Sequence, residues 1–324
     1  MPETTYLEAA IRALTEEMQR DPAVWAVGED LGRGGVFGQY RGLAERFGPE
    51  RICDAPISEA AILGAAVGAA LNGTRPVVEM RFSDFALCAV DELVNQAAKA
   101  RYMFGGQAKV PMVVRQPLGM WRSSAAQHSQ SLEAWYAHIP GLVVVTPATP
   151  ADNYGLLKAA IRCDDPVVYM EHKNLWGLAG AVPEAETVLP IGRARIAREG
   201  GDVTIVTWSA MVHTCTAAAA TLAAEGVEAE VIDLRTLWPW DRDAVLASVE
   251  KTGRLLVAHE AVRVGGFGAE VAATVAETLF GRLRAPVRRL GAPRVPVPYA
   301  PPLEDRLRVT AEHVVAAVRA LMQQ

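Results

Sequence analysis

Strand-like and helix-like patterns alternate along the first half of the chain. Short apolar runs with the length of buried strands are VWAVGEDL (24–31), RPVVEMRF (75–82) and VPMVVRQ (110–116). Between them, segments 58–71 and 83–106 predict helices; in the second, apolar residues recur every four positions from Phe85 to Ala97. Segment 141–171 has the pattern strand, turn, helix, strand. Strands that alternate with helices predict a mostly parallel sheet with helices on both faces.

The second half repeats this alternation after an interruption. Residues 176–192 have no clear period and contain Gly and Pro, so we interpret them as a linker. Strand-like runs then alternate with helical segments, and a last helix is expected near the C-terminus; the helical segments are 211–225, 242–251, 268–281 and 309–322. The pattern therefore predicts two α/β domains, residues 1–175 and 193–324.

Composition and charge add limits on function. The chain has 324 residues, 51% of them hydrophobic, and a net charge of −5. No basic stripe is present to neutralise phosphates, which argues against a nucleic-acid partner. No run of 18 apolar residues predicts a membrane span. Four scattered cysteines without a CxxC pair indicate a reduced protein without a zinc site, and with no signal-peptide pattern they predict a cytoplasmic location.

Glu59 is the first candidate for chemistry. It begins the helix predicted at 58–71, and no residue from Ala60 to Leu71 is charged. A helix that is apolar all round is expected to be buried, and so is its first turn. The helix dipole alone favours a carboxylate there, which is sufficient for a structural role. A buried carboxylate with a raised pKa is also typical of catalytic acids, so both interpretations remain open.

His128 and the glycine-rich segment 263–272 are further candidates for a functional site. His128 lies among small and polar residues in SSAAQHSQSLEAW (123–135), where neighbouring hydroxyl and amide groups could orient its ring. A lone histidine is more often structural. The segment RVGGFGAEVA (263–272) follows a predicted strand, but Val271 stands where the third glycine of a dinucleotide-binding loop belongs. A dinucleotide-dependent dehydrogenase is therefore the least favoured class.

Long blocks of the sequence resemble one known family. Residues 54–107, which begin DAPISEAAILG, and residues 125–171, which begin AAQHSQSLEAW, are similar to the beta subunit of the thiamine-diphosphate-dependent component of 2-oxo acid dehydrogenase complexes. Pyruvate, branched-chain and acetoin dehydrogenases share that subunit. The likeness extends to 28–48, 231–241 and 259–273. It implies a transketolase-like α/β fold with two parallel-sheet domains, a pyrimidine-binding domain and a smaller C-terminal domain.

The resemblance also implies partners. In the family an alpha subunit holds the cofactor's diphosphate through Mg²⁺ with a G-D-G motif, and no G-D-G occurs in this chain. This chain is therefore expected to be catalytically incomplete alone, and the resemblance implies an active enzyme of two alpha and two beta chains. Its substrate would be a 2-oxo acid, and a lipoyl-bearing acyltransferase or a carrier protein would receive the acyl group.

The resemblance assigns roles to individual residues. Glu59 matches the glutamate that hydrogen-bonds the aminopyrimidine ring of thiamine diphosphate, and Phe85 matches the aromatic residue packed on that ring. His128 matches the histidine that faces the substrate. Glu29 matches an acid thought to link paired sites, and Ile57 and Arg81 fall beside the cofactor. The family often binds a structural K⁺ through backbone carbonyls, for which the corresponding residues are Met112, Ala160, Cys163 and Asp165.

The chain departs from the family pattern before His128. The family usually has a glycine-rich run there, where this chain has PLGMWRSSAAQ (117–127) with the bulky Trp121 and Arg122. Arg81 also replaces an uncharged residue. These changes keep two alternatives open. One is a two-chain transketolase-like enzyme that transfers a two-carbon or acyl unit to a sugar or carrier protein, and the other is a non-catalytic scaffold subunit.

Overall fold

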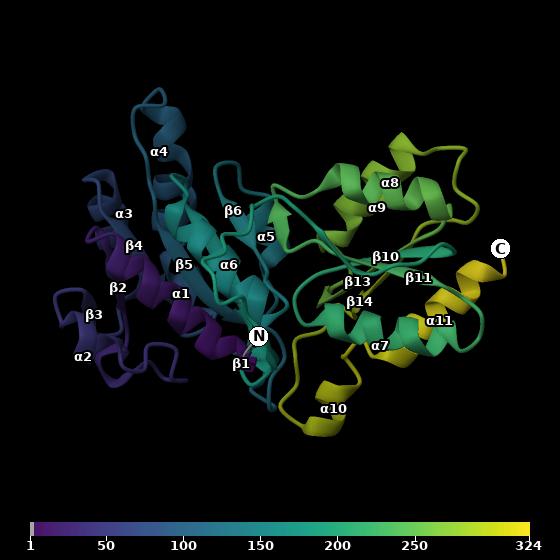
Figure 1. Cartoon of the computed structure of the whole chain (residues 1–324), viewed down its shortest axis with the longest axis horizontal. Helices are drawn as coiled ribbons and strands as arrows, with labels where there is room; N and C mark the ends of the chain where they lie inside the picture. Colours follow the sequence, from purple (N-terminus) through teal and green to yellow (C-terminus); the bar gives the residue numbers. More distant parts are fainter. Residues whose placement is uncertain (1–2) are drawn as a thin grey trace. The chain divides into compact units, whose positions relative to one another are not determined.

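The computed structural model describes residues 3–324 and divides the chain into two compact units (Figure 1). The N-terminal unit comprises the chain up to Leu118 together with Tyr136–Ile191. The C-terminal unit comprises Gly119–Trp135 and Gly192–Gln324. The first domain was expected to be the continuous segment 1–175. Residues 1 and 2 of it lie outside the described residues. In the structure, Gly119–Trp135 (the 119–135 segment) leaves the first unit and belongs to the second.

The N-terminal unit is built on a parallel sheet with the strand order β6-β7-β5-β4-β2-β3. The predicted parallel sheet is thus confirmed. Its strands are β2 (Val24–Gly28), β3 (Ile52–Asp54), β4 (Arg75–Glu79), β5 (Val113–Leu118), β6 (Val143–Val145) and β7 (Val167–His172). A separate antiparallel pair joins β1 (Glu3–Thr5) to β8 (Ala179–Ala181).

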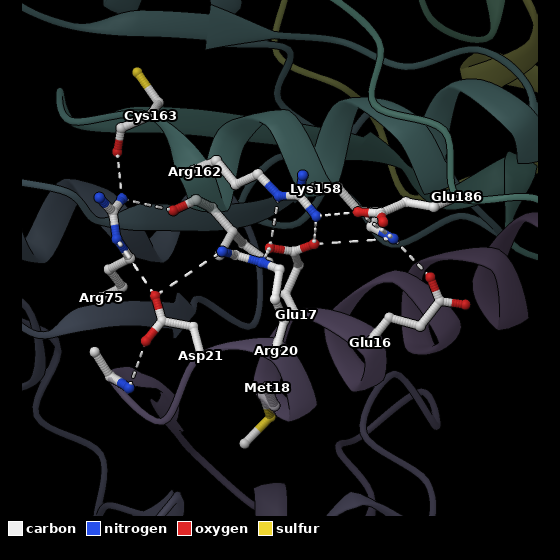
Figure 2. Close-up of polar contacts among 12 residues, drawn as sticks. Glu16, Glu17, Met18, Arg20, Asp21, Arg75, Lys158, Arg162, Cys163 and Glu186 are labelled. Carbon is white, nitrogen blue, oxygen red and sulfur yellow. Dashed lines mark hydrogen bonds and ion pairs between the residues drawn. The ribbon is translucent and has the colours of Figure 1, made fainter.

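Helices α1 (Tyr6–Arg20) and α6 (Pro150–Arg162) pack together on this sheet. Thr5 caps α1 in a reciprocal arrangement with Glu8. An ion pair also joins the two helices: the buried Glu17 of α1 accepts hydrogen bonds from Arg162 of α6 (2.6 and 2.9 Å), as Figure 2 shows. Arg20, on the same helix as Glu17, donates to it as well (2.9 Å). Shorter elements are α2 (Leu43–Phe47), α5 (Glu133–Ala137) and the 3₁₀ turns η1 (Leu31–Arg33) and η4 (Lys173–Leu175).

The helix predicted over 83–106 is not uniform, which corrects the expectation. A 3₁₀ turn η2 (Phe85–Ala89) leads into a π-helical stretch η3 (Asp91–Ala97) and then into α4 (Ala98–Met103). Ala89, Leu93 and Ala97 are all buried. A repeat of four exceeds the 3.6 residues of an α-helical turn, and the wider π turn keeps these side chains on one face.

Helix α3 (Glu59–Leu71) was expected to be buried on all sides, and this is wrong. One face packs inside the unit through Ile62, Leu63, Ala66, Val67 and Ala70. The opposite face is exposed; its residues, the α3 face, are Ala60, Ala61, Gly64, Ala65, Gly68 and Leu71. Polarity along the sequence did not distinguish the two faces, because small apolar residues occupy both.

The C-terminal unit has a sheet with the strand order β14-β13-β10-β11-β9. Only β9 runs antiparallel to its neighbour among the described pairings. Figure 1 shows α8 (Arg242–Thr252) and α9 (Gly268–Thr278) over one face and α7 (Met211–Ala223) and α11 (Ala311–Met322) over the other. The remaining elements are β9 (Arg195–Arg198), β10 (Val203–Thr207), β11 (Ala229–Asp233), β12 (Thr236–Trp238), β13 (Leu255–Val262), β14 (Arg288–Ala292) and α10 (Pro301–Asp305). Within residues 3–324 no helix is both long and apolar enough to cross a bilayer.

A charged group lies inside the N-terminal sheet. Arg115 of β5 is fully buried between Glu171 of β7 (Nη2–Oε2 2.7 Å) and Glu79 of β4 (Nη1–Oε2 3.4 Å). Tyr40 donates to Glu79 (3.1 Å) and Asn153 to Glu171 (2.9 Å). Burial raises the pKa of Glu79 to about 7, although Arg115 opposes the shift. The closer pair, Arg115 and Glu171, is therefore the charged core of the cluster.

Glu79 predicts a pH dependence of stability. Its folded-state pKa lies above its unfolded value, so the folded chain retains a proton that the unfolded chain releases. The free energy of unfolding should fall as pH rises from about 4.5 to 7, by at most about 1.4 kcal/mol per pH unit, and should then level off. In Glu79→Gln this fall should be smaller, as measured by urea unfolding at several pH values. The exposed Glu50→Gln should retain the wild-type slope, and an equal slope in Glu79→Gln would contradict the assignment.

Candidate active site

Three of the predicted site residues follow neighbouring strands of the N-terminal sheet. Glu29 comes directly after β2, Glu59 follows β3 at the start of α3, and Arg81 follows β4. In the sheet, β2 lies between β3 and β4. Because the carboxyl ends of parallel strands meet at one edge, where ligands of α/β proteins bind, the fold brings these residues together.

Glu29 and Arg81 are in contact at this edge. Arg81 pairs with Glu29 (Nη1–Oε2 3.3 Å) and with Asp30 (Nη2–Oδ2 3.5 Å). The strands approach closely here because residue 28 is glycine: a Cβ at Gly28 would lie 2.7 Å from the carbonyl oxygen of Glu79. Asp30 was not among the predicted residues, and its adjacency to Glu29 was the signal that could have found it.

The two carboxylates Glu29 and Glu59 are electrostatically coupled. Glu29 is only 8% exposed, and this burial raises its pKa; the charge of Glu59 raises it further, while Arg81 lowers it. Two carboxyl groups and a guanidinium group therefore act on one another at this edge, and carboxyl groups are among the side chains that general acid–base chemistry uses.

Glu59 stands at the first position of α3 and is partly exposed. The hydroxyl of Ser58, at the N-cap position, donates to the carbonyl of Pro56 (2.8 Å). It accepts no hydrogen bond from the N–H groups of the first turn of α3. Ile57 is 74% exposed beside it.

Aromatic rings line the same region. Phe85 lies edge-on to Phe82 (5.4 Å between centroids), and Phe82 lies edge-on to Phe37 (5.7 Å). The ammonium group of Lys173 lies 4.7 Å from the centre of the Phe82 ring. Phe85 thus belongs to a row of three rings in edge-to-face contact, and it is partly exposed. Phe82 was not among the predicted residues, although it lies three residues before Phe85.

His128 belongs to the 119–135 segment and hence to the C-terminal unit, whereas Glu59 and Phe85 belong to the N-terminal unit. Its backbone N–H donates to the carbonyl of Ala125 (3.4 Å), and its side chain is partly exposed. Neither unit by itself contains both His128 and Glu59, so the structure groups the carboxylates and aromatic rings and places the histidine on a separate segment.

The residues predicted to bind K⁺ lie near the amino ends of the strands, away from the carboxyl edge. Met112 precedes β5, and its carbonyl accepts from Val167 N–H (2.9 Å). The carbonyl of Ala160 accepts from Cys163 N–H (3.2 Å). The side chain of Asp165 pairs with Arg101.

The guanidinium group of Arg75 already hydrogen-bonds one of the carbonyls predicted to bind K⁺, that of Cys163. Arg75 donates to the carbonyls of Cys163 and Ile161 (both 3.0 Å), as Figure 2 shows for Cys163. A carbonyl oxygen has two lone pairs, so each can still accept a second partner. Within residues 3–324 no cluster of His, Cys, Asp and Glu side chains suits a metal ion. The K⁺ site stays a prediction.

Family comparisons match both units. The model of the transketolase pyrimidine binding domain matches residues 3–177, and that of the transketolase C-terminal domain matches residues 192–314.

Relatives align over nearly the whole chain. The acetoin:2,6-dichlorophenolindophenol oxidoreductase subunit beta of Cupriavidus necator is 48% identical, over 96% of this chain and 95% of its own. The 2-oxoisovalerate dehydrogenase subunit beta of Bacillus subtilis is 45% identical over 98% of both chains. The pyruvate dehydrogenase E1 component subunit beta of Rickettsia felis is 44% identical over 97% of both.

A solved structure has the same architecture. A chain described as "Split gene transketolase, inactive beta4 tetramer" aligns over 98% of both chains with a TM-score of 0.78 and 27% identity. The predicted transketolase-like fold is confirmed, and the two domain models, the relatives and the parallel carboxyl edge agree. The chain belongs to the transketolase-like family that includes the beta subunits of pyruvate, branched-chain 2-oxo acid and acetoin dehydrogenases.

Proposed function

We propose that this chain is the beta subunit of a heteromeric thiamine-diphosphate-dependent 2-oxo acid dehydrogenase. With an alpha subunit it would decarboxylate a 2-oxo acid and pass the acyl group to a lipoyl group on a partner acyltransferase. The observation that carries the proposal is the position of Glu59 at the carboxyl edge, coupled to Glu29, in a chain 44 to 48% identical to such beta subunits. A cytoplasmic location is part of the proposal.

The residues at the carboxyl edge fit an aminopyrimidine ring. Glu59 offers a carboxylate to a ring nitrogen, and the accessible part of Phe85 together with the exposed Ile57 offers apolar surface to a flat ring. When bound, thiamine diphosphate supplies the electron sink that decarboxylation requires. Mg²⁺ and the diphosphate would be held by the alpha subunit, and K⁺ by the carbonyls named above.

Each of the proposed site residues then has a role in the reaction. Glu59 holds and returns a proton at the ring nitrogen. Burial and the charge of Glu59 raise the pKa of Glu29, while Arg81 opposes that shift and limits the build-up of negative charge. His128 is the group of this chain proposed to face the substrate and transfer a proton there.

The α3 face is proposed to pack against a partner chain, in an assembly of two alpha and two beta chains. Large apolar side chains near it are also exposed: Tyr102 is 88% and Met103 76% accessible, and Phe104 is exposed too. Extended exposed apolar surface of this kind marks an interface. The alanines and glycines of α3 would let a partner's backbone approach closely.

Gly68→Leu tests this interface. A Cβ at Gly68 would meet no atom of the chain within 4 Å, and leucine favours helix over glycine by up to about 1 kcal/mol. The variant chain should therefore be at least as stable as wild type. Its side chain should nevertheless block a closely packed partner, so sedimentation analysis should show loss of the alpha–beta complex. Gly201→Leu, also at an open exposed glycine, should assemble normally. Normal assembly of Gly68→Leu would contradict the proposed interface.

The reaction is tested by mixing the chain with its alpha partner. We expect thiamine diphosphate to bind to the complex and not to either chain alone, with release of CO₂ from a 2-oxo acid in the presence of an artificial electron acceptor. A complex that binds the cofactor without releasing CO₂ from any 2-oxo acid would contradict the proposal.

A two-chain transketolase-like enzyme is the second candidate. It is favoured by the likeness to the split-gene transketolase chain and by Trp121 and Arg122, which change the approach to His128. Cleavage of a ketose phosphate by the complex, without decarboxylation of 2-oxo acids, would support this candidate. A scaffold subunit would show neither reaction and no cofactor binding.

A further inference from the structure

The 119–135 segment is bound to the C-terminal unit by hydrogen bonds near both of its ends. We propose that Glu260 and Trp208 are positioning residues that determine where this segment presents His128. The inference rests on the proposed role of His128. It gives the C-terminal unit a part in the reaction, although no residue of that unit outside the 119–135 segment is proposed to touch substrate or cofactor.

The first contact is at the start of the segment. The backbone N–H of Met120 donates to the carboxylate of Glu260 (2.7 Å), at the end of β13. The carbonyl of the same residue accepts from Arg308 (3.3 Å). The backbone N–H and C=O of Met120 are thus both hydrogen-bonded by side chains of the C-terminal unit. A hydrogen bond to a carboxylate, such as that of Glu260, is among the stronger ones.

The second contact is near the end of the segment. The indole N–H of Trp208 donates to the carboxylate of Glu133 (3.1 Å), and both side chains are buried, each 2% exposed. A buried carboxylate needs such donors, so this bond is costly to lose. His128 lies between the two contacts along the chain, eight residues after Met120 and five before Glu133.

The backbone between the contacts is strained. Arg122, Ser123 and Ala125 have φ values of 47°, 55° and 64°, in the left-handed region that favours glycine. None of the three is glycine, which is where the chain departs from the glycine-rich family pattern. Such conformations persist only where surrounding contacts impose them.

Open space lies beside the second half of the segment. A cavity of about 680 Å³ lies beside it. Ala126, Ser129 and Leu132 line one side, and Val262, Gly266 and Val295 line the other. With open space next to the residues that flank His128, the hydrogen bonds to Glu260 and Trp208 add to the turns within the segment in restraining its path.

Trp208 packs against the buried His259, the residue before Glu260. The Trp208 ring stacks on His259 (5.1 Å between centroids), whose Nδ1–H donates to the carbonyl of Ala261 (3.0 Å) across Glu260. A Cβ at Gly266 would lie 2.6 Å from the His259 ring, so the turn fits closely over it. Burial lowers the pKa of His259 to about 4, so the ring is neutral at physiological pH.

The test uses Glu260→Ala and Trp208→Phe in the full chain and in the alpha–beta complex. Phenylalanine retains an aromatic ring against His259 but has no N–H donor. We expect hydrogen exchange in 119–135 to become about tenfold faster or more, with the rest of the chain unchanged. In the complex, kcat should fall about 10- to 100-fold with little change in KM for thiamine diphosphate, because the histidine is misplaced and the cofactor site is intact. Glu260→Gln retains an acceptor oxygen and should restore both readouts, and the exposed Glu270→Ala is the control.

Unchanged exchange in 119–135 in both variants would overturn the positioning role. Faster exchange with wild-type kcat would overturn the claim that the position of His128 governs the reaction. If the wild-type complex itself released no CO₂, the proposed function would fail, while the exchange measurement would still decide whether Glu260 and Trp208 hold the segment.

Discussion

Glu59→Gln is expected to reduce the turnover of the alpha–beta complex by about 100- to 10,000-fold, the range over which a positioned acid or base contributes to a reaction. Glutamine has nearly the same shape but cannot hold and return the proton at the aminopyrimidine nitrogen. Because Glu59 is partly exposed and begins α3, removal of its charge should change the free energy of unfolding by less than about 1 kcal/mol. Steady-state CO₂ release and urea unfolding, measured on the same preparations, separate the two effects.

Glu50→Gln, an exposed acid of the same unit, is the matched control and should retain full turnover. Retention of more than half of wild-type turnover in Glu59→Gln would show that the acid is structural. The pKa of Glu29 gives an independent check. Because Glu59 raises it, Glu59→Gln should lower the pKa of Glu29, as followed by NMR of the labelled carboxylate.

Glu171→Gln is expected to have the largest effect on stability, a loss of about 3–5 kcal/mol in the free energy of unfolding. Arg115 is fully buried and makes its two shortest contacts with Glu171, at 2.7 and 2.8 Å. Removal of that charge leaves the guanidinium with Glu79, whose carboxylate oxygen lies farther away, at 3.4 Å from Nη1. Urea unfolding at pH 7 measures the loss.

Two comparisons make this result specific. Glu79→Gln should cost less than Glu171→Gln, because Glu79 already carries part of a proton at pH 7. Glu250→Gln removes a surface partner of Arg282 and should change the free energy by less than about 1 kcal/mol. Equal losses for Glu171→Gln and Glu250→Gln would show that Arg115 does not depend on its buried partner.

The pattern of apolar residues predicted elements correctly where both faces of the element are buried. Strands β4, β5 and β7 are buried on both faces, so their apolar runs were recognised, and the Gly and Pro positions around them marked the turns. The pattern did not distinguish the buried face of α3 from its exposed face. Alanine and glycine are compatible with a core and with a surface that another chain covers, and only the tertiary structure showed that Gly64 and Gly68 face outward.

The candidate site divides in the same way. Glu59 was found from its position before an uncharged helix, and Glu29, Phe85 and Arg81 came from the family resemblance. The contact between Arg81 and Glu29 joins residues 52 positions apart, and no periodicity encodes it. Phe82, Asp30 and the buried Arg115 were missed, because their significance arises from neighbours brought by other strands.

By itself the sequence determined most of the order of strands and helices, the two α/β units, the net charge of −5 and, by resemblance, the family. These depend on short-range spacing and composition, which the chain carries wherever it folds. The tertiary structure alone decided that the 119–135 segment belongs to the C-terminal unit, that α3 has an exposed face and that three carboxyl ends meet at one edge. Strand order and segment docking are set by contacts between residues far apart in sequence, whose free energy exists only once the sheet has formed.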